Sequence, residues 1–254
     1  MESSPLTGRL EMTCDIVIRS YWRDFGWLEM CLAAVERFCS GFSQVIVVIP
    51  NASEPWLRRR AALPPFVRLE LCRDYNDDYL GQQVTKLYAD RRSDAGLICH
   101  LDSDCIVQKP LTPNDLTSEG RPRIYTRAVA DLPRHWPWTR PTAEFLGWMP
   151  THDFMQSPPF TFPRWLYSEI RVWSRREKGV PLSDWVMSRP ARGFSEFNVL
   201  AAYAHEYHRE AFEWLPIGQL ADTDRPCQWF WSWGGLDADT RQLIDRILQP
   251  VSYG

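Results

Sequence analysis

Apolar and polar residues follow two alternating patterns along the first hundred residues. Short runs rich in Ile, Val and Leu predict strands at 15–19, 44–49 and 67–71, and the run at 97–107 predicts a fourth. Between them, apolar residues recur at helical spacing over 24–39 and 80–91. The run at 44–49 is continuously apolar, which is typical of a strand buried on both faces of a parallel sheet. The first half therefore predicts a βαβαβαβ succession.

This succession predicts an α/β fold, with a mostly parallel central sheet flanked by helices and ligands at the carboxyl ends of the strands. Downstream, strands are expected at 123–126 and 211–214, and helices at 164–177, 196–207 and 238–248. The segment 133–163 is rich in Trp and Pro and predicts a long aromatic insertion. Since no linker-like tract interrupts the 254 residues, we expect one domain over 1–254 with a helical C-terminal part.

Two carboxylates end the strand expected near residue 100, in Leu101-Asp102-Ser103-Asp104. The chain has 18 Asp, so about one Asp-x-Asp pair is expected by chance, and three occur. The pair at 222–224 lies in a polar loop, and Asp237 of the third pair reads as a helix N-cap. Only Asp102 and Asp104 follow an apolar strand. Oxygen ligands of this kind suit Mg²⁺ or Mn²⁺ carrying a phosphate-bearing substrate, although a polar turn at the strand end is the simpler alternative.

Charge and composition narrow the classes of partner. The formal net charge of −3 offers no general field for polyanions. Within 119–178, however, ten cations oppose six anions and lie among several Trp residues. Such a surface could stack sugars or bases while touching phosphates, or it could simply pack a long loop onto the body.

The cellular setting is inferred from what the chain lacks. The first residues contain no signal-peptide core, and no run approaches the roughly 20 apolar residues of a membrane span, so we expect a cytoplasmic protein. Seven cysteines without a Cys-x-x-Cys motif predict free thiols. Glycine patterns for a dinucleotide fold, a P-loop or a nucleophile elbow are missing. His205 and His208 stand three residues apart, which is not the spacing of a zincin.

Two other interpretations of the sequence remain open. Asp102-Ser103-Asp104-Cys105-Ile106-Val107 resembles the strand end of haloacid-dehalogenase-type phosphohydrolases, where the first Asp is a nucleophile and the second a general acid. In that family the motif lies near the start of the chain, whereas 101 residues precede it here. The second alternative is a non-enzymatic module that binds nucleic acid or carbohydrate through the Trp and Arg residues of 119–178.

The chain most closely resembles glycosyltransferases of the GT-A fold, and within them a little-characterised bacterial and phage branch. Four short pieces carry the resemblance: residues 18–24, the helix start Gly81-Gln82-Gln83-Val84-Thr85-Lys86-Leu87, the strand end 101–104 and the segment 193–197. The resemblance implies a Rossmann-like half over 1–108 that binds a nucleotide-diphospho-sugar, with a UDP-sugar as the expected donor. It also implies an acceptor-binding and closing half over 109–254.

The resemblance assigns roles to residues of the first half. Asp104 would bind Mn²⁺ or Mg²⁺ directly, Asp102 would contact the metal or the ribose, and Ser103 between them would also contact the donor. The metal would neutralise the departing diphosphate. The remaining donor contacts would come from Arg19, Ser20, Tyr21, Asp24, Gln82 and Lys86. For Lys86, an ordinary exposed helix lysine is the alternative.

In the second half, Glu196 opens a helix where many members of this fold place the base that deprotonates the acceptor hydroxyl. Ser195 as N-cap with an acid in the first turn is also ordinary helix-start chemistry. Many members supply a late histidine to the metal, but none follows His208. Water or one of three later side chains would then replace it: Gln228, Asp222 or Asp224.

The acceptor is expected to contact the aromatic insertion and the helix that follows it, at His152, Asp153, Arg164 and Trp165. A saccharide, a lipid-linked glycan or the hydroxymethyl group of a modified pyrimidine in phage DNA is chemically accessible to such a transferase. A DNA acceptor would require base flipping.

Overall fold

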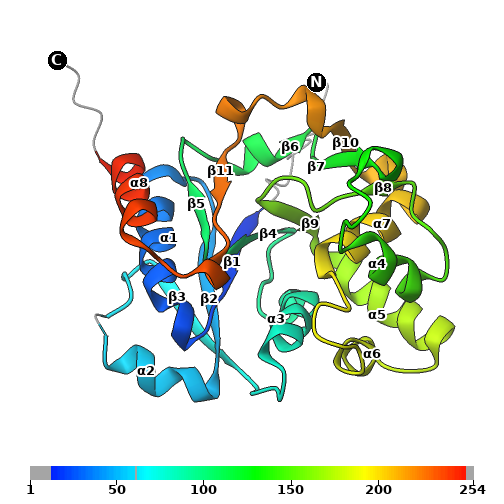
Figure 1. Ribbon diagram of the computed structural model, residues 1–254, viewed down its shortest axis with the longest axis horizontal. Coiled ribbons are helices and arrows are strands. Elements are labelled where there is room, and N and C mark those ends of the chain that lie inside the picture. Colours follow the sequence, from blue (N-terminus) through cyan, green and yellow to red (C-terminus); the bar gives the residue numbers. More distant parts are fainter. Residues whose placement is uncertain (1–12, 61, 250–254) are drawn as a thin grey trace, which may run out of the picture.

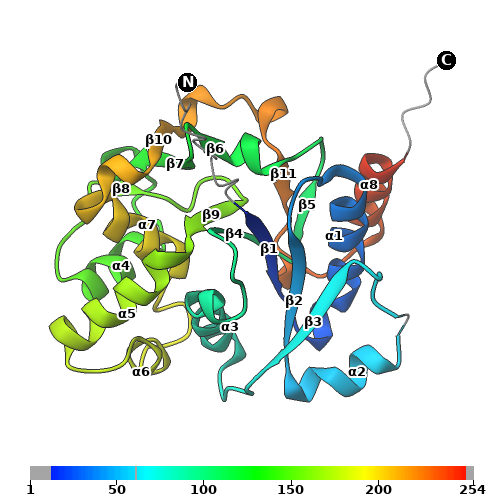
Figure 2. The same cartoon turned by 180° about the vertical axis from the view of Figure 1, so that it is seen from behind.

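The computed structural model describes residues 13–60 and 62–249 and contains a central five-stranded sheet. Its strand order is β3-β2-β1-β4-β9, in which the first four strands are parallel and β9 is antiparallel (Figure 2). The elements of the first half are β1 (Cys14–Arg19), α1 (Phe25–Phe38), β2 (Gln44–Pro50), α2 (Glu54–Arg58), β3 (Val67–Cys72), α3 (Asp78–Leu87), β4 (Leu97–Asp102) and β5 (Cys105–Val107). The mixed α/β architecture with a mostly parallel sheet is confirmed.

The second half adds helices and several short strands. These are β6 (Thr117–Ser118), β7 (Arg121–Ala128), α4 (Thr139–Leu146), β8 (His152–Asp153), β9 (Phe160–Pro163), α5 (Arg164–Lys178), α6 (Leu182–Met187), α7 (Glu196–Tyr207), β10 (Glu213–Pro216), β11 (Cys227–Trp229) and α8 (Ala238–Leu248). β10, β7, β6 and β8 form a second small sheet, and β11 pairs antiparallel with β5. All strands and helices expected in this half are present within a few residues.

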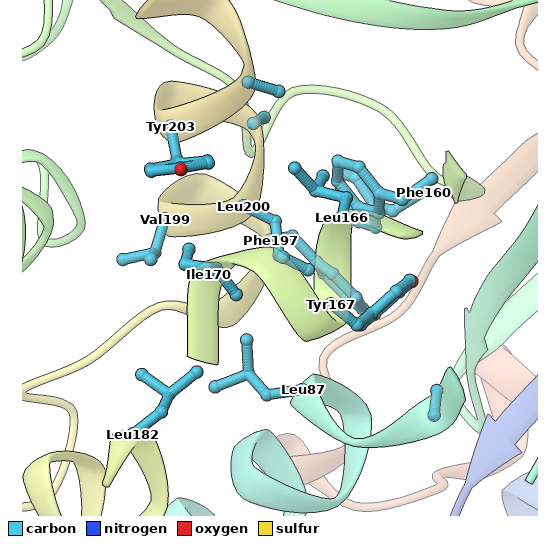
Figure 3. Close-up of a cluster of buried hydrophobic side chains, with 14 of the residues drawn as sticks. Leu87, Phe160, Leu166, Tyr167, Ile170, Leu182, Phe197, Val199, Leu200 and Tyr203 are labelled. Carbon is cyan, nitrogen blue, oxygen red and sulfur yellow. The ribbon is translucent and has the colours of Figure 1, made fainter. Parts of the chain in front are cut away.

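Alternation along the central strands sends side chains to two separate cores. On β1, Ile16 and Ile18 join the core under α1, whereas Val17 joins the core under α3, α5 and α7. Figure 1 shows α1 and α8 on one side of the sheet and α3 to α7 on the other. Figure 3 shows Leu87 of α3, Tyr167 of α5 and Phe197 of α7 in the core under these three helices. Because both faces are covered, polar groups of the strands are accessible mainly at their ends.

One expectation about the second half is wrong. The segment 133–163 is not only an aromatic insertion, because it contains α4 and supplies β9 to the edge of the central sheet. β9 pairs with β4 through the register His100 with Phe160 and Leu97 with Pro163. A four-residue strand between prolines is too short to produce a readable alternation. The same reason explains why the pattern does not predict β11 or the short helices α2 and α6.

Two further findings concern the cysteines and the helices. The seven cysteines are free thiols. Across residues 13–60 and 62–249, no helix is both long enough and apolar enough to cross a bilayer.

Candidate functional site

A cavity of about 470 Å³ opens at the carboxyl ends of β1 and β4, and we call it the central cavity. Arg19 is the last residue of β1 and Asp102 the last of β4, and both side chains line it. The rest of its wall comes from the segments that follow β1 and β4, one face of α3, the loop before α4, Met155, the turn into α7 and its first residue, and the end of β11 with the segment after it. The cavity therefore lies where a parallel sheet is expected to bind ligands.

Three charged side chains form a buried cluster in the wall of the cavity, which we call the charged cluster. Lys86 Nζ lies 2.5 Å from Asp102 Oδ1 and donates to Glu196 Oε1 at 2.8 Å. Only 4% of the Lys86 side chain is exposed, which excludes the ordinary exposed lysine. Burial alone lowers the pKa of Lys86, but the two carboxylates outweigh this effect and hold it above its ordinary value. Lys86 is thus a fixed cation that joins the end of β4 to the start of α7.

Beneath this cluster, His100 is buried in the neutral form. Its Nε2 lies 2.7 Å from the Tyr167 hydroxyl, and its ring lies 5.1 Å from that of Phe197. Burial lowers the pKa of His100 to about 3, and the charge of Lys86 contributes to the fall. A second positive charge beside Lys86 is therefore avoided.

Asp104 and Asp24 are connected by Ser232, which follows β11. The Ser232 backbone N–H donates to Asp104 Oδ2 at 2.9 Å, and its hydroxyl donates to Asp24 Oδ2 at 3.5 Å. Burial raises the pKa of Asp104 to about 7, and the negative charge of Asp102 contributes to the rise. Burial likewise raises the pKa of Asp24 to about 6. In both groups, burial favours the protonated form of the carboxyl.

The charges of the cavity do not balance. Three cations, Arg19, Lys86 and Arg192, line it together with five acidic side chains, for a formal charge of −2. Arg19 forms a two-pronged ion pair with Asp78 at the start of α3. An anionic ligand would therefore need an accompanying cation.

The local sequence explains how two helices present their polar residues. Tyr79, Gln82, Gln83 and Lys86 lie at i, i+3, i+4 and i+7 of α3, so they share the face that lines the cavity. The chain enters α7 through a tight turn, in which Arg192 has a left-handed φ of 64°. A Cβ at Gly193 would lie 2.8 Å from the Pro190 carbonyl oxygen, so the turn requires glycine.

Aromatic side chains complete the wall. Trp136 and Trp138 reach the cavity from the loop before α4. Trp229 and Trp231 stack on each other with ring centroids 4.8 Å apart, and Trp229 also contacts Phe160 of β9. The wall of the cavity therefore combines charged side chains with aromatic rings on which a flat ring can stack.

The donor set suits a hard divalent cation bound partly by its substrate. Among the described residues, no group of three or more His, Cys, Asp or Glu side chains is arranged to hold a metal ion. Asp102 and Asp104 provide two carboxylates, and Mg²⁺ characteristically uses one or two carboxylates together with substrate phosphates and water. The residues therefore fit a metal that arrives with a phosphate-bearing ligand.

The structure brings most of the predicted donor residues together. Nine of the predicted site residues line the central cavity: Arg19, Tyr21, Asp24, Gln82, Lys86, Asp102, Ser103, Asp104 and Glu196. Ser20 is buried, donates its backbone N–H to Val48 O and does not line the cavity. Its neighbour Tyr21, which also follows β1, lines the cavity.

The four residues expected at the acceptor do not line the cavity. Asp153 is fully buried, and its Oδ1 accepts from the Met155 N–H. The His152 ring lies 5.3 Å from that of His205. Arg164 donates to Ser93 O near the amino end of β4, and Trp165 packs on His208. Because β9 runs antiparallel to β4, the chain that follows it emerges at the opposite end of the strand from Asp102.

The residues considered as a replacement for a late histidine also lie elsewhere. Gln228 lies opposite Ile106 where β11 pairs with β5, and Asp222 forms an ion pair with Arg225. Neither they nor Asp224 line the cavity.

Several lining residues are not among those predicted. On α3, Tyr79 and Gln83 could have been found, because they share one helix face with the predicted Gln82 and Lys86. By contrast, nothing local connects Trp229, Trp231 and Ser232 to Asp104, since their place depends on the long-range pairing of β11 with β5.

Comparison with known proteins places the chain in a family whose function is unknown. No protein of curated function matches the chain. A family model described as "Family of unknown function (DUF6492)" matches residues 22–209, which include α3, β4, α7 and the charged cluster. The chain therefore belongs to this family of unknown function, DUF6492.

Proposed function

We propose that this protein is a metal-dependent glycosyltransferase that moves a sugar from a nucleotide-diphospho-sugar to an acceptor hydroxyl. The observation that carries the proposal is the charge of the central cavity, where Asp102 and Asp104 lie beside each other in a wall of formal charge −2. A diphosphate would be repelled by this wall unless a divalent cation bridged the two. The stacking surfaces of the same cavity suit a nucleobase and a sugar.

Asp104 and Asp102 would hold the cation, Mn²⁺ or Mg²⁺, which when bound stabilises negative charge on a departing diphosphate. Lys86 holds the Asp102 carboxylate in place by a 2.5 Å ion pair. Arg19, Tyr21 and Asp24 lie at the end of β1, where they would contact the nucleoside part of the donor.

Glu196 is the proposed base for the acceptor hydroxyl. Its Oε1 is engaged by Lys86 Nζ, so a proton from the acceptor would have to go to Oε2. The ion pair orients this carboxylate at the start of α7, and acceptor binding is assigned to the Trp residues that line the cavity rather than to the four residues outside it.

The test is a thermal-shift and hydrolysis panel with UDP- and GDP-sugars, with and without Mn²⁺. We expect Mn²⁺ and a nucleotide sugar together to stabilise the protein more than either alone, and slow release of the nucleoside diphosphate. A ligand present at 100 times its Kd stabilises by about 2.7 kcal/mol. Asp104→Asn should abolish both responses.

The matched control is Asp239→Asn, in an exposed Asp-x-Asp pair at the start of α8. It should behave like the native protein. Equal responses of the two variants, or none to any nucleotide sugar, would refute the proposal. Phosphate release from monoesters would instead favour a phosphohydrolase, and saccharide or nucleic-acid binding that EDTA leaves intact would favour a binding module.

A further inference from the structure

Four side chains that line the central cavity, apart from Asp102, which pairs with Lys86, carry a buried polar atom without a hydrogen-bond partner among the described residues. Two of these atoms, Arg19 Nε and Trp136 Nε1, can only donate, whereas Gln83 Oε1 and Ser195 Oγ can accept. Only 3% of Gln83 and 2% of Ser195 is exposed. Buried polar atoms without partners are uncommon in native proteins and carry a free-energy cost. Atoms of this kind in a ligand cavity indicate a bound group that satisfies them.

Gln83 and Ser195 flank the charged cluster. Gln83 lies one turn before Lys86 on the cavity face of α3, and Ser195 directly precedes Glu196. Ser195 occupies the N-cap position of the twelve-residue helix α7, yet its side chain makes no capping hydrogen bond. A serine at this position normally accepts from the second or third backbone N–H of the helix. The Ser195 hydroxyl is thus available to form a hydrogen bond with a ligand.

The chemistry of these atoms selects the ligand. Gln83 Oε1 can only accept, and the neighbouring carboxylates of Asp102 and Glu196 also only accept. Phosphate and carboxylate oxygens would therefore leave Gln83 Oε1 unsatisfied and would be repelled by the two acids. A sugar hydroxyl, in contrast, can donate to Gln83 and accept from Ser195.

We propose that Gln83 and Ser195 determine donor specificity by binding hydroxyl groups of an uncharged sugar ring, the sugar that is transferred. This inference rests on the proposed function and names the class of donor. The expected donors carry neutral hexoses. A uronic acid is disfavoured because its carboxylate would lie among the acceptor oxygens of Gln83, Asp102 and Glu196. A site built to bind a hydroxyl discriminates strongly against ligands that lack it, because its own buried groups are then left unpaired.

The test combines Gln83→Met and Ser195→Ala with calorimetric titration in the presence of Mn²⁺. The probes are UDP, GDP, UDP-glucose, UDP-galactose, GDP-mannose and UDP-glucuronate. We expect each variant to bind the best neutral nucleotide sugar at least tenfold more weakly while binding the free nucleotide normally. Without ligand, the Tm of each variant should be unchanged or higher, since the substitution removes an unsatisfied polar atom. Gln219→Ala, at an exposed glutamine outside the cavity, is the control and should change neither quantity.

The outcomes separate this inference from the proposed function. If the native protein binds no nucleotide and no nucleotide sugar, both fail. If it binds them but the variants weaken nucleotide and nucleotide sugar equally, or change neither, the donor assignment is overturned and the transferase proposal stands. Preferential binding of UDP-glucuronate by the native protein also overturns it. A lower Tm of Ser195→Ala with unchanged sugar affinity would show that Ser195 serves the helix instead.

Discussion

His100 should make the protein less stable in mild acid, and His100→Gln should remove this effect. The imidazole is 1% exposed, and burial lowers its pKa from 6.5 to about 3. Below pH 6.5 the unfolded chain takes up a proton at this residue while the folded protein does not. The free energy of unfolding therefore falls as the pH falls from about 6.5 toward 3.

The magnitude follows from the distance between pH 5 and the unfolded pKa of 6.5. That distance of about 1.5 pH units, at about 1.4 kcal/mol per unit, gives a loss of about 2 kcal/mol between pH 8 and pH 5. The substituted glutamine does not titrate, and its amide can still bond with the Tyr167 hydroxyl. The buried carboxyl groups act in the opposite direction, but they are present in both proteins and cancel in the difference.

The assay is urea unfolding of the native protein and of His100→Gln at pH 8 and at pH 5. The native protein should lose about 2 kcal/mol more than the variant on acidification. His135→Gln, at an exposed histidine, should leave the native pH dependence unchanged. An identical loss in the native protein and in His100→Gln would contradict the neutral, buried imidazole described above.

Three further predictions concern stability and are checked by denaturant unfolding at pH 8. Lys86→Met should cost about 3–5 kcal/mol, because it leaves the buried carboxylate of Glu196 and the partly buried carboxylate of Asp102 without their cation; a cost below about 1 kcal/mol would argue against this role of Lys86. Gly81→Ala should cost about 1–3 kcal/mol, since the new Cβ would lie 2.6 Å from a tyrosine ring, whereas Gly218→Ala meets open space and should stay within about 0.5 kcal/mol of the native value. Asn198→Ala should cost at least about 1–3 kcal/mol because the buried Phe154 N–H loses its acceptor at 2.7 Å, and a neutral result would show that another group replaces it.

The part of the fold that could be predicted from the sequence is the part that local pattern determines. β2 is continuously apolar because both of its faces are covered, and α3 and α7 keep helical spacing over ten and twelve residues. Asp102 and Asp104 could be found for the same reason, since they end a buried strand. The partners of Lys86 could not be predicted, because Glu196 lies 110 residues away in sequence.

Ser195 shows a subtler limit of sequence reasoning. Serine before an acidic first turn predicts a capping side chain, and the helix does begin at the next residue, but the hydroxyl makes no capping bond. Arg164 and Trp165 lie away from the cavity for a topological reason, because the pattern did not reveal that β9 runs antiparallel beside β4 and leaves the sheet at the end opposite Asp102. His152 and Asp153 precede β9 and form β8, which pairs with β7.

The pairing of β11 with β5 brings a segment from outside the matched family region into the site. The matched region ends at residue 209, whereas the strand that carries Trp229 and the turn that carries Ser232 follow it. The charged cluster lies inside the shared region, and one wall of the same cavity lies outside it. Exchanging residues 226–236 between members would therefore change the shape of the site while leaving its charged residues in place, which makes this segment the natural unit for altering ligand choice.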